Sequence, residues 1–154
     1  MVQVKHKSGF TLVEIMVVVV IIGLLAALAI PAFSKARQSS QNSRLASDLR
    51  LYAGAVETFT LENGEFPEDS NSGAIPAGLS PYIHSSQWNE GPSIGGVWDV
   101  EKDSMGIVSA IGVHGFTVPL QQLADFDRKY DDGDLTTGNY RRLATDRYYL
   151  VVAE

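Results

Sequence analysis

The chain has 154 residues, no cysteine, and a formal net charge of −6 from 12 basic and 18 acidic side chains. This length supports one modest domain with its own core, beside any membrane segment. The missing cysteines exclude disulfides, and the acidic balance argues against nucleic-acid binding through bulk electrostatics, so no nucleic-acid partner is predicted.

A basic leader with Lys5 and Lys7 precedes a long apolar run at residues 15–30, and Glu14 stands at the head of this run. An acidic side chain at mid-depth in a bilayer costs about 2.5–3.5 kcal/mol on insertion scales. Glu14 therefore calls for a cationic partner and a functional explanation.

Two ordinary interpretations leave Glu14 unexplained. A secretory signal peptide would be cleaved near Ala27-Leu28-Ala29 and would release residues 30–154 as a soluble domain. A plain membrane anchor at residues 10–33 would span roughly 36 Å as a helix, enough for a hydrocarbon layer of about 30 Å. Neither needs a carboxylate at this position.

Glu14 ends the string Gly9-Phe10-Thr11-Leu12-Val13-Glu14, which is followed by the apolar run and then by Pro31. This pattern resembles the N-terminal signature of type IV pilins and type II secretion pseudopilins. The resemblance implies that residues 1–9 are a leader and that a prepilin peptidase on the cytoplasmic side cleaves between Gly9 and Phe10. Phe10 would then become the N-methylated N-terminus.

The same resemblance gives Glu14 a partner and the chain a location. The methylated Phe10 amine of a neighbouring subunit would pair with Glu14 in the filament, which removes the cost of an unpaired buried ion. The subunit would span the inner membrane once before assembly and then join a periplasmic or extracellular filament. Implied partners are further copies of the chain, minor pilins or pseudopilins, and an inner-membrane assembly platform.

After the apolar run, a helical pattern continues through residues 34–63. Apolar residues recur at spacings of three and four and so form one stripe of an amphipathic helix: Leu45, Leu49, Tyr52, Val56 and Phe59. Asn63-Gly64 supplies a helix stop, and Pro67 prevents the helix from resuming. Residues 10–61 are thus predicted to form one helix of roughly 78 Å.

Gly23 and Pro31 interrupt this predicted helix. A proline inside a regular helix costs about 3 kcal/mol or more, although membrane helices tolerate it. One interpretation is a kink without a function. The family resemblance implies the other, in which helicity is lost between the two residues in the filament and Pro31 serves assembly.

Residues 64–154 are predicted to form a head with six basic and fourteen acidic side chains, a net charge of −8. Residues 95–100 and 107–113 are typical of strands joined by a turn at residues 101–106, and residues 148–152 of a third strand. A short helix is expected to open near Pro119. The predicted fold class is α+β: a long N-terminal helix packed on a small antiparallel sheet.

A cluster of acidic residues follows the short helix and includes Asp131, Asp132 and Asp134. Clustered aspartates supply the oxygens that calcium prefers, and related pseudopilins use calcium to hold a C-terminal loop without a disulfide. The spacing does not match an EF-hand loop. Asp-Asp-Gly-Asp is also a common turn composition, which Arg128, Arg141 and Arg142 are placed to neutralise.

No pattern in the sequence predicts an enzyme. His84 and His114 lie in no arrangement that binds zinc or activates a nucleophile, and each is expected at the surface or at a sheet edge. The prediction is a structural subunit of a type IV pilus-like filament, specifically a type II secretion pseudopilin. The alternatives are a surface type IV pilin for adhesion, motility or DNA uptake, and a membrane-anchored periplasmic binding module.

Overall fold

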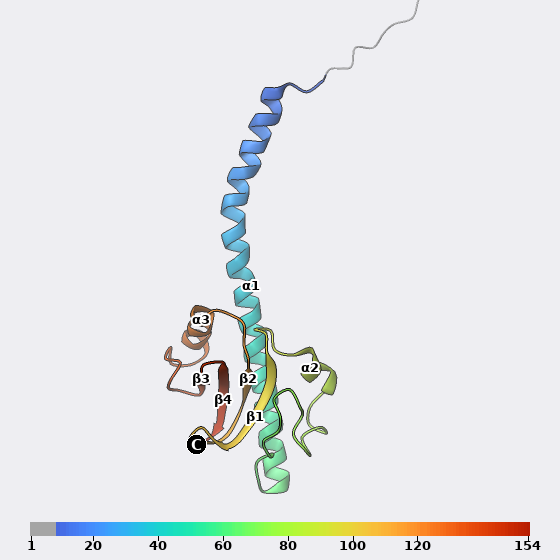
Figure 1. The fold of residues 1–154 in the computed structure, drawn as a ribbon, viewed down its shortest axis with the longest axis vertical. Helices are drawn as coiled ribbons and strands as arrows, with labels where there is room; N and C mark the ends of the chain where they lie inside the picture. The colour runs from blue at the N-terminus through green and yellow to red at the C-terminus, as the bar shows by residue number, and fades with distance from the viewer. Residues whose placement is uncertain (1–8) are drawn as a thin grey trace, which may run out of the picture. The chain divides into compact units, whose positions relative to one another are not determined.

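The computed structural model describes residues 9–154 (Figure 1), so Lys5, Lys7 and residues 1–8 of the predicted leader lie outside the described residues. The chain forms two compact units, one that ends at Gln38 and one that comprises Ser39–Glu154. In chain order the elements are α1 (Leu12–Asn63), α2 (Ser85–Glu90), β1 (Val97–Ser104), β2 (Ile107–His114), α3 (Leu120–Tyr130), β3 (Tyr140–Ala144) and β4 (Arg147–Ala153). The fold is α+β, as predicted.

Helix α1 ends where the sequence places its stop signal. Gly64 has a φ of +78°, and its N–H donates a hydrogen bond to the Thr60 carbonyl oxygen at 2.8 Å. Glycine adopts this left-handed conformation without steric cost, and it commonly terminates helices. Helix α1 begins two residues after the predicted start at residue 10, because Thr11 caps the helix from outside, and it ends two residues after the predicted end at residue 61, because the last turn extends to Asn63.

The helix is continuous through Gly23 and Pro31. Pro31 is exposed, and a Cβ built at Gly23 meets nothing within 4 Å apart from the helix's own backbone. The described subunit therefore keeps its helix at the place where the resemblance implies a loss of helicity. That loss stays a prediction about the filament.

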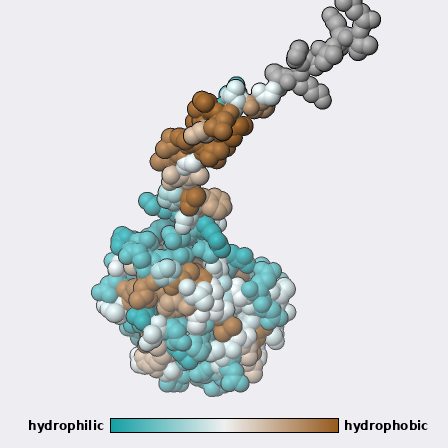
Figure 2. Space-filling model, turned by 45° about the horizontal axis from the view of Figure 1, so that its top comes forward, coloured by the Kyte–Doolittle hydropathy of each residue, from teal (hydrophilic) through white to brown (hydrophobic). Residues whose placement is uncertain are grey.

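The apolar side chains of the first unit have no core to pack into. The large apolar side chains from Phe10 to Phe33 have exposed fractions from 51% for Ile15 to 85% for Phe10. Figure 2 shows them as a dense group on the helix. Within the described residues, α1 is the one helix long and apolar enough to cross a membrane, and its most apolar stretch is 0% buried.

The second unit is a four-stranded antiparallel sheet in the order β1-β2-β4-β3. Leu45, Leu49, Tyr52 and Val56 of α1 are at most 2% exposed and form one core with side chains of the sheet, whereas Phe59 is partly buried at its edge. The predicted stripe is therefore confirmed. Trp98 of β1 and Tyr148 of β4 are fully buried in this core.

Three details of the head differ from the prediction. Strand β1 continues to Ser104, so the turn is the tight pair Met105-Gly106, with φ of 50° and 81°. The predicted turn at residues 101–106 is too long, because β1 is an edge strand and an edge strand carries polar side chains readily. Strand β3 and helix α2 were not predicted.

Candidate functional site

A capping box closes the N-terminal end of α1. Glu14 Oε2 accepts hydrogen bonds from the Thr11 N–H at 2.8 Å and from the Thr11 hydroxyl at 2.7 Å, and the Glu14 N–H donates to Thr11 Oγ1 at 3.2 Å. In such a box, the residue before the first turn and the glutamate three positions later satisfy each other's N–H groups. The Thr-Leu-Val-Glu sequence thus starts its own helix. The spacing of Thr11 and Glu14 is the sequence signature of a capping box, and it could have predicted this helix start.

The box leaves Glu14 able to bind a cation. Both hydrogen bonds reach Oε2, so Oε1 can accept a further donor without breaking them. Glu14 is exposed in the single subunit. In lipid or inside a filament the same carboxylate would require a positive partner, since an unpaired buried charge is costly. The arrangement suits the predicted contact with a neighbour's Phe10 amine.

Gly9 and Phe10, the predicted cleavage residues, lie just before the capping box. Both are exposed and outside regular structure. A Cβ built at Gly9 meets nothing within 4 Å. Exposed, irregular backbone is the kind that proteases reach, so the geometry suits cleavage between these residues.

The predicted metal residues Asp131, Asp132 and Asp134 lie in the loop between α3 and β3. Their carboxylates accept hydrogen bonds from donors of the same segment, namely the N–H groups of Asp134, Thr136, Asn139 and Tyr140 and the hydroxyls of Thr136 and Thr137. The backbone N–H of Asp134 lowers the pKa of Asp132, and the Thr136 hydroxyl lowers the pKa of Asp134.

Arginine pairing does not neutralise this loop, so that expectation is wrong. Within residues 9–154, none of Asp131, Asp132 and Asp134 forms an ion pair. The three arginines bind elsewhere: Arg128 to Asp125 at 3.0 Å, Arg141 to Glu154, and Arg142 to the Thr145 carbonyl oxygen at 3.0 Å. Short local donors reach the carboxylates without ordering a long side chain, which carries an entropic cost.

A group suited to a cation includes Asp127 in place of Asp134. Asp127, Asp131 and Asp132 each offer an oxygen within 4.8 Å of the other two. Asp127 is fully buried at the end of α3 and accepts from the Tyr148 hydroxyl at 2.9 Å, and burial raises its pKa. Calcium takes six to eight oxygens, so these carboxylates would supply part of a coordination shell. Calcium binding stays a prediction.

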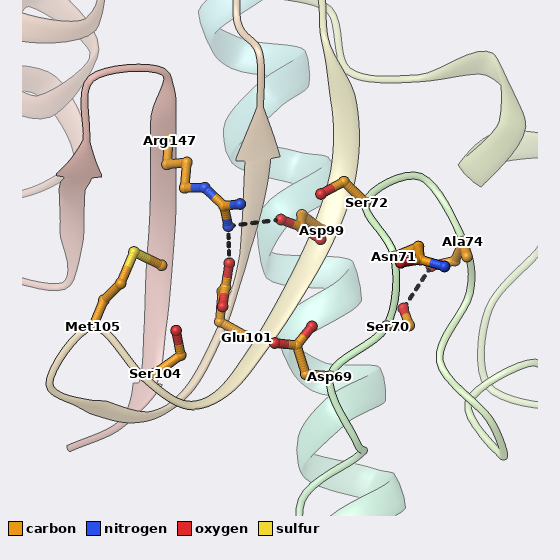
Figure 3. A pocket seen from close by; sticks show the side chains of 10 residues that line it. All are labelled: Asp69, Ser70, Asn71, Ser72, Ala74, Asp99, Glu101, Ser104, Met105 and Arg147. Carbon is orange, nitrogen blue, oxygen red and sulfur yellow. Dashed lines mark hydrogen bonds and ion pairs between the residues drawn. The ribbon is translucent and has the colours of Figure 1, made fainter.

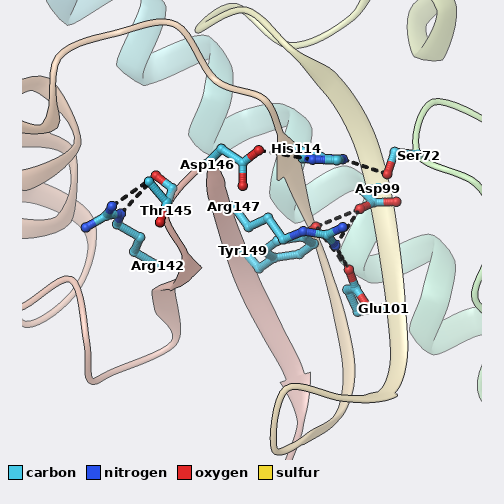
Figure 4. A network of polar contacts seen from close by, with 9 residues as sticks. All are labelled: Ser72, Asp99, Glu101, His114, Arg142, Thr145, Asp146, Arg147 and Tyr149. Atoms are coloured by element: carbon cyan, nitrogen blue, oxygen red, sulfur yellow. Dashed lines mark hydrogen bonds and ion pairs between the residues drawn. The ribbon is translucent and has the colours of Figure 1, made fainter.

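His114, at the end of β2, lies between two elements of the head (Figure 4). Its Nδ1 is 2.7 Å from Ser72 Oγ, and its Nε2 is 3.2 Å from Asp146 Oδ2. The histidine thus ties the loop of residues 69–74 to the turn between β3 and β4. His114 is partly exposed at the end of an interior strand, not at a sheet edge, whereas His84 is exposed on the surface, as expected.

Comparisons with known proteins find relatives for the N-terminal segment and for most of the chain. The family model of the prokaryotic N-terminal methylation motif matches residues 4–30. The fimbrial protein EcpC of Eikenella corrodens is 33% identical over 119 residues, which cover 77% of this chain and 76% of that protein. The type IV major fimbrial protein FimA of Dichelobacter nodosus is 33% identical over 111 residues, covering 68% and 69%.

A third relative comes from a secretion apparatus. The type II secretion system core protein G of Klebsiella pneumoniae is 33% identical over 88 residues, 56% of this chain and 63% of that protein. The match thus spans less than two thirds of the secretion protein. No solved structure matches the chain significantly.

An exposed apolar helix behind a methylation motif, attached to an α+β head, defines a filament subunit of the pilin class. The chain belongs to the family of type IV pilins and type II secretion pseudopilins. Its relatives are structural subunits and not enzymes.

Proposed function

We propose that this chain polymerises as a structural subunit of a type IV pilus-like filament, the periplasmic pseudopilus of a type II secretion apparatus. The observation that carries the proposal is the exposed apolar surface of α1 with Glu14 at its head. A contiguous apolar surface of this kind is stable in lipid or against other apolar helices. Assembly covers it and supplies a cation for Glu14.

The relationship to type II secretion core protein G supports the pseudopilus, as does a small acidic head without a disulfide. One observation favours a second candidate, a surface pilus for adhesion, motility or DNA uptake: the match to EcpC covers more of the chain, 77% against 56%. The family relationship favours either filament over a membrane-anchored binding module.

The proposal includes a path for the subunit. It is inserted in the inner membrane with residues 1–9 in the cytoplasm, cleaved by prepilin peptidase after Gly9, and methylated on Phe10. An inner-membrane assembly platform then adds it to a filament with further copies and with minor pilins or pseudopilins. This orientation rests on the family, because Lys5 and Lys7 before the apolar run are matched by Lys35 and Arg37 after it.

Deletion and complementation in the native host separate the two filaments. The pseudopilus proposal expects that deletion abolishes release of secreted enzymes into the medium, while surface pili remain visible by electron microscopy. Loss of surface pili with normal secretion would favour the second candidate. If neither secretion nor pili change, the proposed function is wrong.

Calcium is the cofactor predicted for the same subunit at Asp131, Asp132 and Asp134, and we propose that Asp127 takes the place of Asp134 in the site. Binding stabilises a fold by RT ln(1 + [L]/Kd), about 2.7 kcal/mol at a hundredfold excess over Kd. Calcium should therefore raise the melting temperature of the detergent-solubilised chain, and a chelator should lower it. Asp131→Asn should remove the response and Asp134→Asn should retain it, since Asp134 lies outside the group. If wild type shows no response, the loop is held by its hydrogen bonds alone.

A further inference from the structure

The head contains a polar cavity of about 1000 Å³ that the proposed function does not use (Figure 3). Its walls are the loop of residues 69–74, strand β1 with the following turn, and the first residue of β4. Trp98 and Val100 of β1 point into the core with α1. Asp99 and Glu101 alternate with them and so point to the opposite face of the sheet, into the cavity.

Two buried carboxylates in this cavity share one guanidinium group. Asp99 is 2% exposed and Glu101 is 4% exposed. Nη1 of Arg147 lies 3.3 Å from Asp99 Oδ2 and also contacts Glu101 Oε1. The Tyr149 hydroxyl donates to Asp99 Oδ2 at 2.7 Å (Figure 4). Because Arg147 is the one cation paired with both Asp99 and Glu101, the three side chains together carry a formal charge of −1.

A third carboxylate, Asp69, adds to this negative charge. Asp69 lines the cavity, is exposed, and forms neither an ion pair nor a side-chain hydrogen bond within residues 9–154. The lining therefore carries three carboxylates and one guanidinium group, a formal charge of −2. Burial first, and then the charges of Asp69 and Asp99, raise the pKa of Glu101 despite Arg147. A cation that binds in the cavity would offset the repulsion between these carboxylates.

Two cations of the described residues, 9–154, have no partner in the subunit. Lys35 and Arg37 are exposed on α1, in the first unit. Among residues 9–154, every other lysine and arginine has a carboxylate, an aromatic ring or a carbonyl oxygen as its partner: Arg44, Arg50, Lys102, Arg128, Lys129, Arg141, Arg142 and Arg147. The unpaired positive and negative groups of one subunit are complementary.

We propose that this cavity receives the side chain of Lys35 or Arg37 from a second copy of the chain in the filament. The inference rests on the proposed function, because it requires that subunits contact one another in a filament. Asp99 Oδ2 and Glu101 Oε1 hold Arg147, so the second oxygen of each carboxylate, together with Asp69, can accept donors of the incoming cation. Contact between complementary charges fixes register between heads.

Charge reversal tests the pairing through filament yield. Lys35→Glu with Arg37→Glu should reduce sheared filaments by about tenfold or more, because like charges then face each other. Cleavage and membrane insertion should be unchanged. Adding Asp69→Lys should restore most of the yield, whereas Glu57→Lys should not, since Glu57 is an exposed carboxylate that does not line the cavity. Equal rescue by both, or by neither, would overturn the proposal.

Disulfide trapping tests the contact directly, since the chain has no cysteine of its own. Chains that carry Asp69→Cys with Lys35→Cys or with Arg37→Cys should give a ladder of covalent multimers when assembled filaments are oxidised. The matched pairs with Glu57→Cys should give at most traces.

The outcomes separate this inference from the proposed function. Filaments that assemble normally but show no ladder with either Asp69→Cys pair would overturn the inference and leave the function standing. Failure of the unmodified chain to form filaments would contradict the function, and the inference with it.

Discussion

The first unit exposes its apolar side chains, whereas the second unit uses the same helix, α1, to bury Leu45, Leu49 and Tyr52 against a sheet. This difference in burial follows from how the apolar residues are distributed around the helix. Residues 15–30 are apolar all round the helix, so no single protein face can cover them, but the later stripe is narrow enough for one sheet. Stability of the fold is therefore expected to depend on the second unit and assembly on the first.

The largest effect should come from Glu14→Val. Without the carboxylate, a neighbour's Phe10 amine would be buried unpaired, and loss of one partner of a buried ion pair typically costs about 3–5 kcal/mol. Sheared filaments should fall by about tenfold or more. Membrane insertion should be as good as wild type or better, since a costly charge is removed. The measurement compares filament and membrane fractions by immunoblot.

Thr11→Val is the matched control, because it breaks the capping box and keeps the carboxylate of Glu14. Loss of an N-cap typically costs about 1 kcal/mol at the start of the helix. This variant should still assemble. If both variants lose filaments equally, Glu14 acts through the helix cap; if neither does, its predicted role in assembly is wrong.

The next effect in size tests whether the stability of the fold depends on the second unit. Leu49→Ala in the fully buried core should destabilise the head by about 2–5 kcal/mol. Leu28→Ala, at a residue that is 75% exposed, should change it by less than about 0.5 kcal/mol. Thermal unfolding of the detergent-solubilised chain measures both. Equal destabilisation would show that the first unit contributes to the fold after all.

The smallest effect concerns two carboxylates of the head with opposite pKa shifts. Burial raises the pKa of Glu101 above its ordinary 4.5, so its ionisation opposes folding at neutral pH. Glu101→Gln keeps an oxygen beside Arg147, which Asp99 still pairs, so the variant should gain stability relative to wild type at pH 7. This advantage should fade as pH falls through the raised pKa and vanish below 4.5.

Asp132→Asn should show the reverse dependence on pH. Hydrogen bonds lower the pKa of Asp132, the largest from the Asp134 N–H, so its ionised form favours folding above 3.8. The variant should be less stable than wild type at pH 7, with a difference that disappears in acid. Parallel pH profiles for the two variants would contradict both assignments.

Elements with strong periodicity were predictable from sequence. The stripe through Leu45 and Leu49, the stop at Gly64 and strands β2 and β4 follow from apolar spacing and turn chemistry. Strand β3 was missed because Arg141 and Arg142 interrupt any apolar alternation, and its place is set by pairing with β4. Helix α2 is only six residues long, too short for a periodic signal.

The residues of the candidate sites also divide into those that the sequence identifies and those that only the fold brings together. The motif from Gly9 to Glu14 is contiguous, so sequence alone identified it. Asp127 was not among the predicted metal residues, because its burial near Asp131 and Asp132 depends on the packing of α3 against Tyr148 of β4. The cavity with Asp99 and Arg147 combines residues 48 positions apart, and only the strand order brings them together.

The central claim is that residues 1–9 are removed and that the apolar helix stays attached to the head. Intact-mass and N-terminal analysis of the chain from the membrane and from filaments tests it directly. The expected result is a start at methylated Phe10, with the uncleaved precursor accumulating when Gly9→Phe is introduced. The fold should tolerate this substitution, because Gly9 is exposed and lies outside regular structure. A mature chain that starts at Met1 or at Ile30 would contradict the account.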